Sequence, residues 1–145
     1  MTAFADLSAA VKAALIQAPA LAGGRVYRAR HVDLEHGATS CIEISPIEHQ
    51  AEALGLAGPV RMWQTTLAVL IKVRAAAGID AEAALDPLLG DVWQRLSEMA
   101  LPTGARGITL VPRIRIDFEE TERTVATAAL ALQIDHVTTT TALTA

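Results

Sequence analysis

Side chains able to bind a metal ion gather in residues 31–36, which read HVDLEH. Two imidazoles and two carboxylates within six residues are ligand types that zinc and other transition metals accept. A metal site also needs fixed spacing, and this stretch fits neither the helical HExxH frame nor a strand frame that would align all four groups. The spacing therefore favours a solvated loop, and we expect no metal site here.

The other two histidines are candidates for acid–base chemistry. His49 directly follows Glu48 and lies near Glu43 in the sequence, and His136 directly follows Asp135. Neighbouring residues on a strand point to opposite faces, however, so Asp135 cannot readily orient His136. No nucleophile motif accompanies either imidazole. We therefore expect no catalytic residue and no enzymatic activity.

Cysteine and glycine usage gives no sign of a cofactor. Cys41 is the only cysteine, which excludes an internal disulfide, and the alternation around it favours a small packed residue. Glycines cluster at 23–24 and within 55–58, but neither cluster follows a strand and opens a helix as a phosphate-binding loop requires. We expect no bound metal, nucleotide or other cofactor.

Length and charge limit the class of protein further. The chain has 145 residues, enough for one domain with a substantial core, and 52% of them are hydrophobic. A net charge of −4 opposes general nucleic-acid binding, although ten of the twelve basic residues are arginine, which makes directional contacts. No run approaches the roughly 20 apolar residues of a membrane span, and the N-terminus lacks a signal-peptide pattern. We expect a soluble intracellular protein that contacts no membrane.

The N-terminal part of the chain predicts one helix and one short strand. Apolar residues recur at helical spacing over 4–18, and Pro19 ends that helix because it lacks an N–H. RVYRA at 25–29 reads as a short strand. Residues 31–40 are polar and aperiodic, so we expect a loop there.

The middle of the chain predicts a hairpin with one unusually long strand. CIEIS at 41–45 alternates like a half-buried strand, and Pro46 confines it to an edge or a strand exit. Residues 47–60 predict a long hairpin arm or a mobile loop. From 62 to 74 the side chains alternate over about 40 Å of extended chain, well beyond a typical strand.

A second helix follows, and one proline interrupts its pattern. Asp80 is a good capping residue, and apolar residues between 85 and 99 form a stripe with helical spacing. A proline inside a helix costs about 3 kcal/mol. We therefore expect a break, with a short first turn and then a new helix that Asp86 caps and Pro87 begins.

The last third predicts a long hairpin. Residues 108–119 alternate clearly between apolar and polar side chains, and 124–137 alternate again after a charged turn. The Thr-rich tail 138–145 has no core pattern, and we expect it to be flexible or held by a partner. Together the elements predict one α+β domain over 1–137, with a mostly antiparallel sheet, two helices packed on one face and a long C-terminal β-hairpin.

Charged side chains on the first strand of that hairpin are the best candidates for a binding surface. Such a stripe is either a solvated sheet face or a subunit interface in which arginine pairs with carboxylates. His49 lies in the irregular segment 47–60, where recognition often concentrates, and Arg28 and Arg30 belong to a second small basic group with Arg25. The candidate interface residues are Arg28, Arg30, His49, Arg113, Arg115 and Asp117.

Five phrases of the sequence, in this order, carry a family resemblance. They are APALAGGRVY (18–27), CIEIS (41–45), WQTTLAVLIKVRA (63–75), AEAALDPLLGDVWQRL (81–96) and ALALQIDH (129–136). With the N-terminal helix, they resemble the tail terminator proteins of long-tailed bacteriophages, the group of the lambda minor tail protein U and its relatives in Mu-like phages. The resemblance covers nearly the whole chain to about residue 137.

The resemblance implies a virion protein without enzymatic activity. It implies a homo-oligomeric ring, commonly a hexamer, that caps the tail tube, ends its polymerisation and meets the neck or head-completion protein. DNA would pass through the lumen without specific binding. The protein would assemble in the host cytoplasm and reside at the tail–neck junction.

Three alternatives remain open. A neck or stopper protein would belong to the same class but occupy another position in the particle. A small ligand-binding or enzymatic α+β oligomer would need a pocket that joins His49 or His136 to arginine residues. A regulatory or toxin-like protein-binding module would be monomeric when isolated.

Overall fold

The computed structural model describes residues 2–29, 33–35, 37–53, 58–120, 123–139 and 143. Its elements, in chain order, are α1 (Ala3–Ile16), the 3₁₀ turn η1 (Leu21–Gly24), β1 (Val26–Arg28), β2 (Ser40–Ala53), β3 (Arg61–Arg74), α2 (Ala81–Ser97), β4 (Ala105–Leu110), β5 (Arg115–Glu120) and β6 (Thr124–Thr138). Among the residues described, no helix has the length and apolar character needed to cross a membrane.

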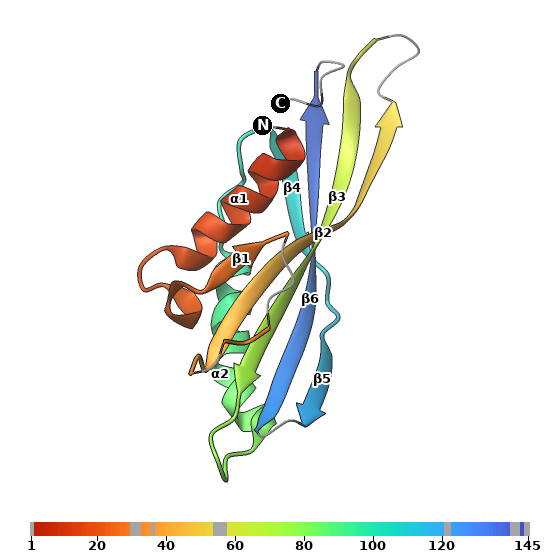
Figure 1. The fold of residues 1–145 in the computed structure, drawn as a ribbon. Helices are drawn as coiled ribbons and strands as arrows, with labels where there is room; N and C mark the ends of the chain where they lie inside the picture. The colour runs from red at the N-terminus through yellow and green to blue at the C-terminus, as the bar shows by residue number, and fades with distance from the viewer. Residues whose placement is uncertain are drawn as a thin grey trace.

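A long antiparallel ladder between β3 and β6 forms the middle of the sheet (Figure 1). The ladder runs from Arg61 opposite Thr138 to Arg74 opposite Val125. β2 pairs antiparallel with β3, and β1 adds parallel to the outer side of β2. β4 and β5 both pair antiparallel with the other side of β6. These pairings confirm the predicted mostly antiparallel sheet.

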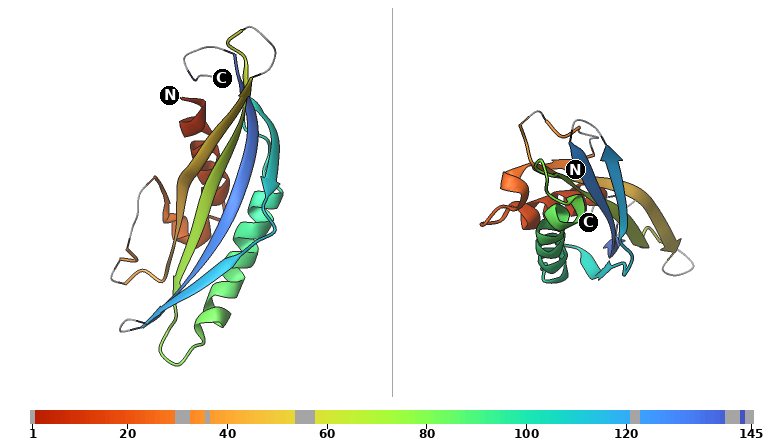
Figure 2. Two further views of the ribbon diagram at one scale, coloured as in Figure 1. Left: turned by 90° about the vertical axis from the view of Figure 1, so that its right-hand side faces the viewer. Right: turned by 90° about the horizontal axis from the view of Figure 1, so that it is seen from below.

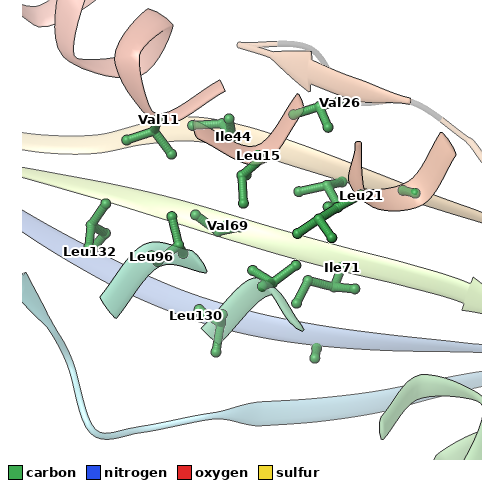
Figure 3. Close-up of a cluster of buried hydrophobic side chains, with 14 of the residues drawn as sticks. Val11, Leu15, Leu21, Val26, Ile44, Val69, Ile71, Leu96, Leu130 and Leu132 are labelled. Carbon is green, nitrogen blue, oxygen red and sulfur yellow. The ribbon is translucent and has the colours of Figure 1, made fainter. Parts of the chain in front are cut away.

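Both helices cover one face of the sheet, and the core lies between the two layers (Figure 2). Alternate residues of β3 and β6 point toward the helices because successive strand side chains point to opposite faces. Leu7, Val11 and Leu15 of α1 and Leu85, Val92 and Leu96 of α2 pack against them. Figure 3 shows Val11, Leu15 and Leu96 among these core side chains. Alternate residues over 65–73 and 130–136 are buried, in agreement with the alternation predicted for these strands. We call the side without helices the open face.

β2 continues past Pro46 to Ala53, so the strand is longer than the 41–45 predicted, while the predicted position of Pro46 on an edge is confirmed. The parallel partner β1 stops at Arg28, opposite Ile44, and beyond that point no other described residues pair with the outer side of β2. A proline without an N–H is tolerated on an edge, and a bulge between Pro46 and Glu48 absorbs the irregularity. The hairpin arm predicted for 47–60 is confirmed, and its tip, residues 54–57, lies outside the described residues.

The predicted strand 108–119 is divided into β4 and β5. Leu110 pairs with Leu132 and Arg115 pairs with Ala129, so the residues 111–114 between them face only two residues of β6. Pro112 lies in this segment and cannot donate to a ladder, which is the physical reason for the interruption. Arg113 therefore lies in the connection and not on a strand with Arg115.

α2 is one continuous helix, so the predicted break at Asp86-Pro87 is wrong. Asp80 caps the helix, since its Oδ1 accepts hydrogen bonds from the N–H groups of Glu82 (2.9 Å) and Ala83 (3.1 Å). Pro87 leaves the carbonyl of Ala83 without its helical donor, but both residues are exposed, so water can donate instead. Packing of the apolar stripe holds the rest of the helix in place.

The two chain ends meet at one end of the sheet. Thr138, which the sequence places in the tail, is the last residue of β6 and is buried. Its Oγ1 accepts a hydrogen bond from Nε1 of Trp63 at 2.9 Å. The N–H of Ala3 donates to the carbonyl of Leu143 at 2.9 Å. Most of the predicted flexible tail lies outside the described residues.

Replacing Pro87 by Ala should raise the free energy of unfolding by about 1–2 kcal/mol. In a continuous helix the new N–H at position 87 can donate to the carbonyl of Ala83. Urea denaturation measures the change, and Pro112→Ala, outside any helix, is the matched control that should gain nothing. A loss of stability in Pro87→Ala would instead indicate that Pro87 begins a separate helix.

Candidate functional site: an exposed strand and a histidine pair

Two predicted interface residues lie together on β5. Arg115 Nε donates to Asp117 Oδ2 at 3.1 Å, and the two side chains are 77% and 62% exposed. Their ladder partners, Ala129 and Thr127, lie on the open face, so this pair faces away from the helices. An exposed ion pair stabilises a subunit by less than about 1 kcal/mol. The pair therefore contributes little to the stability of the fold.

Exposed apolar side chains lie on the other side of β5 and just before it. Ile116 and Phe118 of β5 are 38% and 52% exposed, and Ile114, which precedes the strand, is 42% exposed. Ile116 and Phe118 pair with Ala128 and Ala126 on the helix side, as the alternation predicts, but neither is buried there. Three large apolar side chains so close together form a patch of the kind that marks protein contacts. We call these three residues the β5 patch. The charged stripe alone had not indicated it.

The structure describes only one of the two predicted interface arginines near β1. Nη1 of Arg28 donates to the carbonyl of Ala5 (3.0 Å) and to Oγ of Ser8 (3.4 Å), so it ties β1 to the first turns of α1. These contacts give Arg28 a role within the subunit. Arg30 lies outside the described residues.

The structure brings His49 and His136 together through one threonine. Thr65 Oγ1 lies 3.0 Å from His49 Nδ1 and 2.9 Å from His136 Nε2. The three residues come from β2, β3 and β6, whose registers place them side by side on the helix face. Sequence reasoning had considered the histidines separately because the strand register was unknown.

Burial sets the charge and the hydrogen positions of this pair. It lowers the pKa of His49, and it lowers the pKa of His136, which nearby His49 lowers further and Asp135 partly opposes. Within the described residues, Nδ1 of His136 is buried without a partner. A lone pair without a donor is cheaper to bury than an N–H without an acceptor, so we assign Nε2–H as the donor to Thr65. Thr65 then donates to His49 Nδ1.

An aromatic cluster packs against the hydrogen-bonded residues His49, Thr65 and His136. Phe4 of α1 stacks on His49 with ring centroids 4.1 Å apart. It also meets Trp63 and His136 edge-on, at 5.0 Å and 5.4 Å. The cluster joins the first turn of α1 to β2, β3 and β6. Together with the neutral hydrogen-bond chain of His49, Thr65 and His136, this cluster stabilises one end of the sheet.

A pocket beside His136 lacks the composition that the enzymatic alternative requires. It has a volume of about 470 Å³ and is lined by the N-terminal half of α1, residues 101–104, His136 and Val137. Its described lining contains one ionisable group besides His136, the carboxylate of Asp6, and no arginine. The combination of histidine and arginine predicted for that alternative is therefore not formed at this pocket.

The metal candidate at 31–36 is only partly visible, because His31 and His36 lie outside the described residues. The described residues contain no group of three or more side chains suited to holding a metal ion. Arg74 instead holds the neighbouring backbone, with Nη2 donating to the carbonyl of Leu34 at 2.9 Å and Nη1 to those of Glu35 and Ala38, each at 3.2 Å. Arg74 of β3 therefore holds the backbone of this segment against the sheet.

Near Arg74, an ion pair is buried on the open face. Lys72 Nζ lies 2.7 Å from Glu43 Oε1, and the side chains are only 12% and 1% exposed. Cys41 lies next to it and is buried, as predicted for a packed residue. Burial raises the pKa of the Cys41 thiol, which favours the unreactive protonated form.

Comparison with known proteins identifies a related fold. No protein-family model matches the chain, and no curated protein matches it. A chain from the virion of a native gene transfer agent (GTA) particle has the same fold, with a TM-score of 0.64. The match covers 92% of this chain and 96% of that chain, at 18% sequence identity. At this identity the match shows a shared fold.

Thr65→Val should destabilise the protein by roughly 1–3 kcal/mol, because it leaves the Nε2–H of His136 buried without an acceptor. The substitution keeps the shape of the side chain, so lost packing is small. Thr66→Val, the neighbouring residue on the open face, is the matched control and should change stability little. Equal effects of the two substitutions in urea denaturation would contradict the hydrogen-bond chain.

Stability should fall as the pH drops below about 6.5, the ordinary histidine pKa. Both imidazoles have a folded pKa below that value, so the unfolded chain binds more protons in this range and unfolding is favoured. Denaturation between pH 5 and 8 measures the slope, and NMR titration of the imidazole signals gives each pKa. A folded pKa above 6.5 for His136, or greater stability at pH 5.5 than at pH 7.5, would contradict the assignment.

Proposed function

We propose that this protein is a virion structural protein that acts as a tail terminator. In this role several copies, in the family commonly six, form a ring on the end of the tail tube. The ring ends tube polymerisation and presents a surface to the neck or head-completion protein. The protein acts without catalysis or a cofactor, at the tail–neck junction of the particle.

The observation that carries the proposal is the fold shared with a virion chain. The match extends over 92% of this chain and 96% of that chain, so it concerns the fold as a whole and not one motif. The sequence resemblance to tail terminators is independent support. Its quoted phrases fall on η1 and β1, β2, β3, α2 and β6, which are the framework of the fold.

The shape of the subunit supports ring formation. A ring requires heterologous contacts, in which one surface of a subunit meets a different surface of the next. The sheet offers two different outer edges, β1 with the end of β2 beyond it on one side and β4 with β5 on the other. The β2–β3 arm also extends beyond the N-terminal end of α1 (Figure 1). Such a subunit has distinct surfaces for its neighbours.

The β5 patch and the Arg115–Asp117 pair provide two further surfaces for partners in the virion, one on each side of β5. Exposed apolar side chains like those of the patch mark protein contacts. The charged pair on the open face offers directional polar contacts. The net charge of −4 suits a lumen through which DNA passes without specific binding.

Negative-stain electron microscopy of tail tubes tests the function directly. Tube subunits from the same genome would polymerise with and without this protein. We expect tubes of limited length with a ring-shaped cap when it is present, and longer uncapped tubes when it is absent. Tubes that grow equally long in both samples, with no protein at their ends, would contradict the terminator role.

A further inference from the structure

We infer that neighbouring subunits join through their sheet edges, with the outer edge of β2 in one copy pairing with the outer edge of β4 in the next. We call the first surface, residues 46–53, the arm edge, and the second, residues 105–110, the β4 edge. The inference rests on the proposed ring and names the contact that builds it. The partner is a second copy of this chain.

Both edges have room for another strand. β1 ends opposite Ile44, so along the arm edge β3 is the ladder partner of β2 within the described residues. β4 pairs with β6 on its inner side, and the described part of the chain supplies no strand to its outer side. Unpaired backbone groups along a strand edge are a template for adding a strand.

The hydrogen-bond pattern shows which arm-edge groups point outward. Ile42 donates to the carbonyl of Arg25, and the carbonyl of Ile44 accepts from Ala29, so these positions face away from β3. Outward and inward positions alternate in an antiparallel ladder. Because the bulge after Pro46 adds one residue, the outward N–H groups beyond it belong to His49 and Ala51.

The strand directions match as well. β2 is antiparallel to β3, β3 to β6, and β6 to β4, so β2 and β4 run in opposite directions. When two copies are related by a rotation about an axis parallel to the strands, the strands of both copies keep the same directions. The β4 edge of one copy therefore meets the arm edge of the next in antiparallel orientation, and the sheet continues from subunit to subunit.

The two edges also lie at the same level along the strands. Ala51 pairs with Trp63, Trp63 with His136, and His136 with Ala105. This row crosses the sheet from the arm edge to the β4 edge. A rotation without translation can therefore bring the two edges together, which is the condition for a closed ring and not an open helix.

Charge favours this pairing over the symmetric alternatives. Glu48 and Glu52 lie on the arm edge and Arg106 on the β4 edge, all three exposed. Glu52 and Arg106 both border a pocket of about 330 Å³ on the open face, and within the described residues these three side chains form no ion pair. Pairing of unlike edges places opposite charges together, whereas two arm edges would oppose four carboxylates.

Disulfide cross-linking tests the contact. Glu52→Cys and Arg106→Cys in one chain give each copy one new thiol on each edge, and buried Cys41 stays in place as in the wild type. Under mild oxidation, alone and with tail tubes, we expect a ladder of dimers, trimers and higher species that ends at the ring. Each single variant alone should stay uncross-linked, and an equal mixture of the two should stop at dimers.

Two outcomes would overturn the inference. One is a disulfide-linked dimer from Glu52→Cys alone, which would indicate pairing of two arm edges. The other is a double variant that stays monomeric both in solution and on tubes. As a second variant, Arg106→Glu should raise the concentration for half-assembly about tenfold, and adding Glu52→Arg should restore it.

The result can be separated from the test of function. A cross-linking ladder from a protein that does not cap tubes would leave the edge contact standing and reject the terminator role. Capped tubes without the ladder would retain the terminator role and reject the edge contact. Native mass spectrometry of the unmodified protein gives the copy number in either case.

Discussion

The ladder between β3 and β6 is the constraint on which the rest of the structure depends. It pairs all fourteen residues of β3 in a continuous antiparallel register. This register decides which side chains meet the helices and which form the open face. It also brings His136 beside Trp63 and sets the level at which β2 and β4 end. The core, the hydrogen-bond chain through Thr65 and the positions of both sheet edges depend on this one pairing.

Much of the fold could be predicted because period-two and period-3.6 patterns are local. The alternation in β3 and β6 and the apolar stripes of both helices gave their buried faces correctly. Local patterns predicted the wrong element at two prolines. Pro87 remains inside α2 because packing of the helix outweighs one missing hydrogen bond, and Pro112 interrupts a strand although the alternation continues across it. Pro46 lies on a strand edge, as predicted, and β2 continues past it because its N faces away from β3.

The candidate site was less predictable because it depends on contacts between distant segments. Nothing local indicates that Thr65 lies between two histidines, since that follows from the registers of three strands. The exposure of Ile116 and Phe118 could not be predicted either, because a strand has the same alternating sequence pattern whether or not a helix covers its apolar side. Arg115 and Asp117 share one side of their strand, as alternation alone predicts. Contacts between subunits are still harder to predict from the sequence, because they depend on a sheet edge of each of two subunits.

Hydrogen–deuterium exchange of the protein alone and bound to tail tubes tests the central claim, that sheet edges build a ring on the tube. Backbone amides exchange slowly when they are hydrogen-bonded, so edge pairing must slow those that point outward. The account predicts slower exchange in both 46–53 and 105–110 on binding, at the outward amides such as that of Ala51. Unchanged exchange in both segments of a tube-bound protein would contradict it.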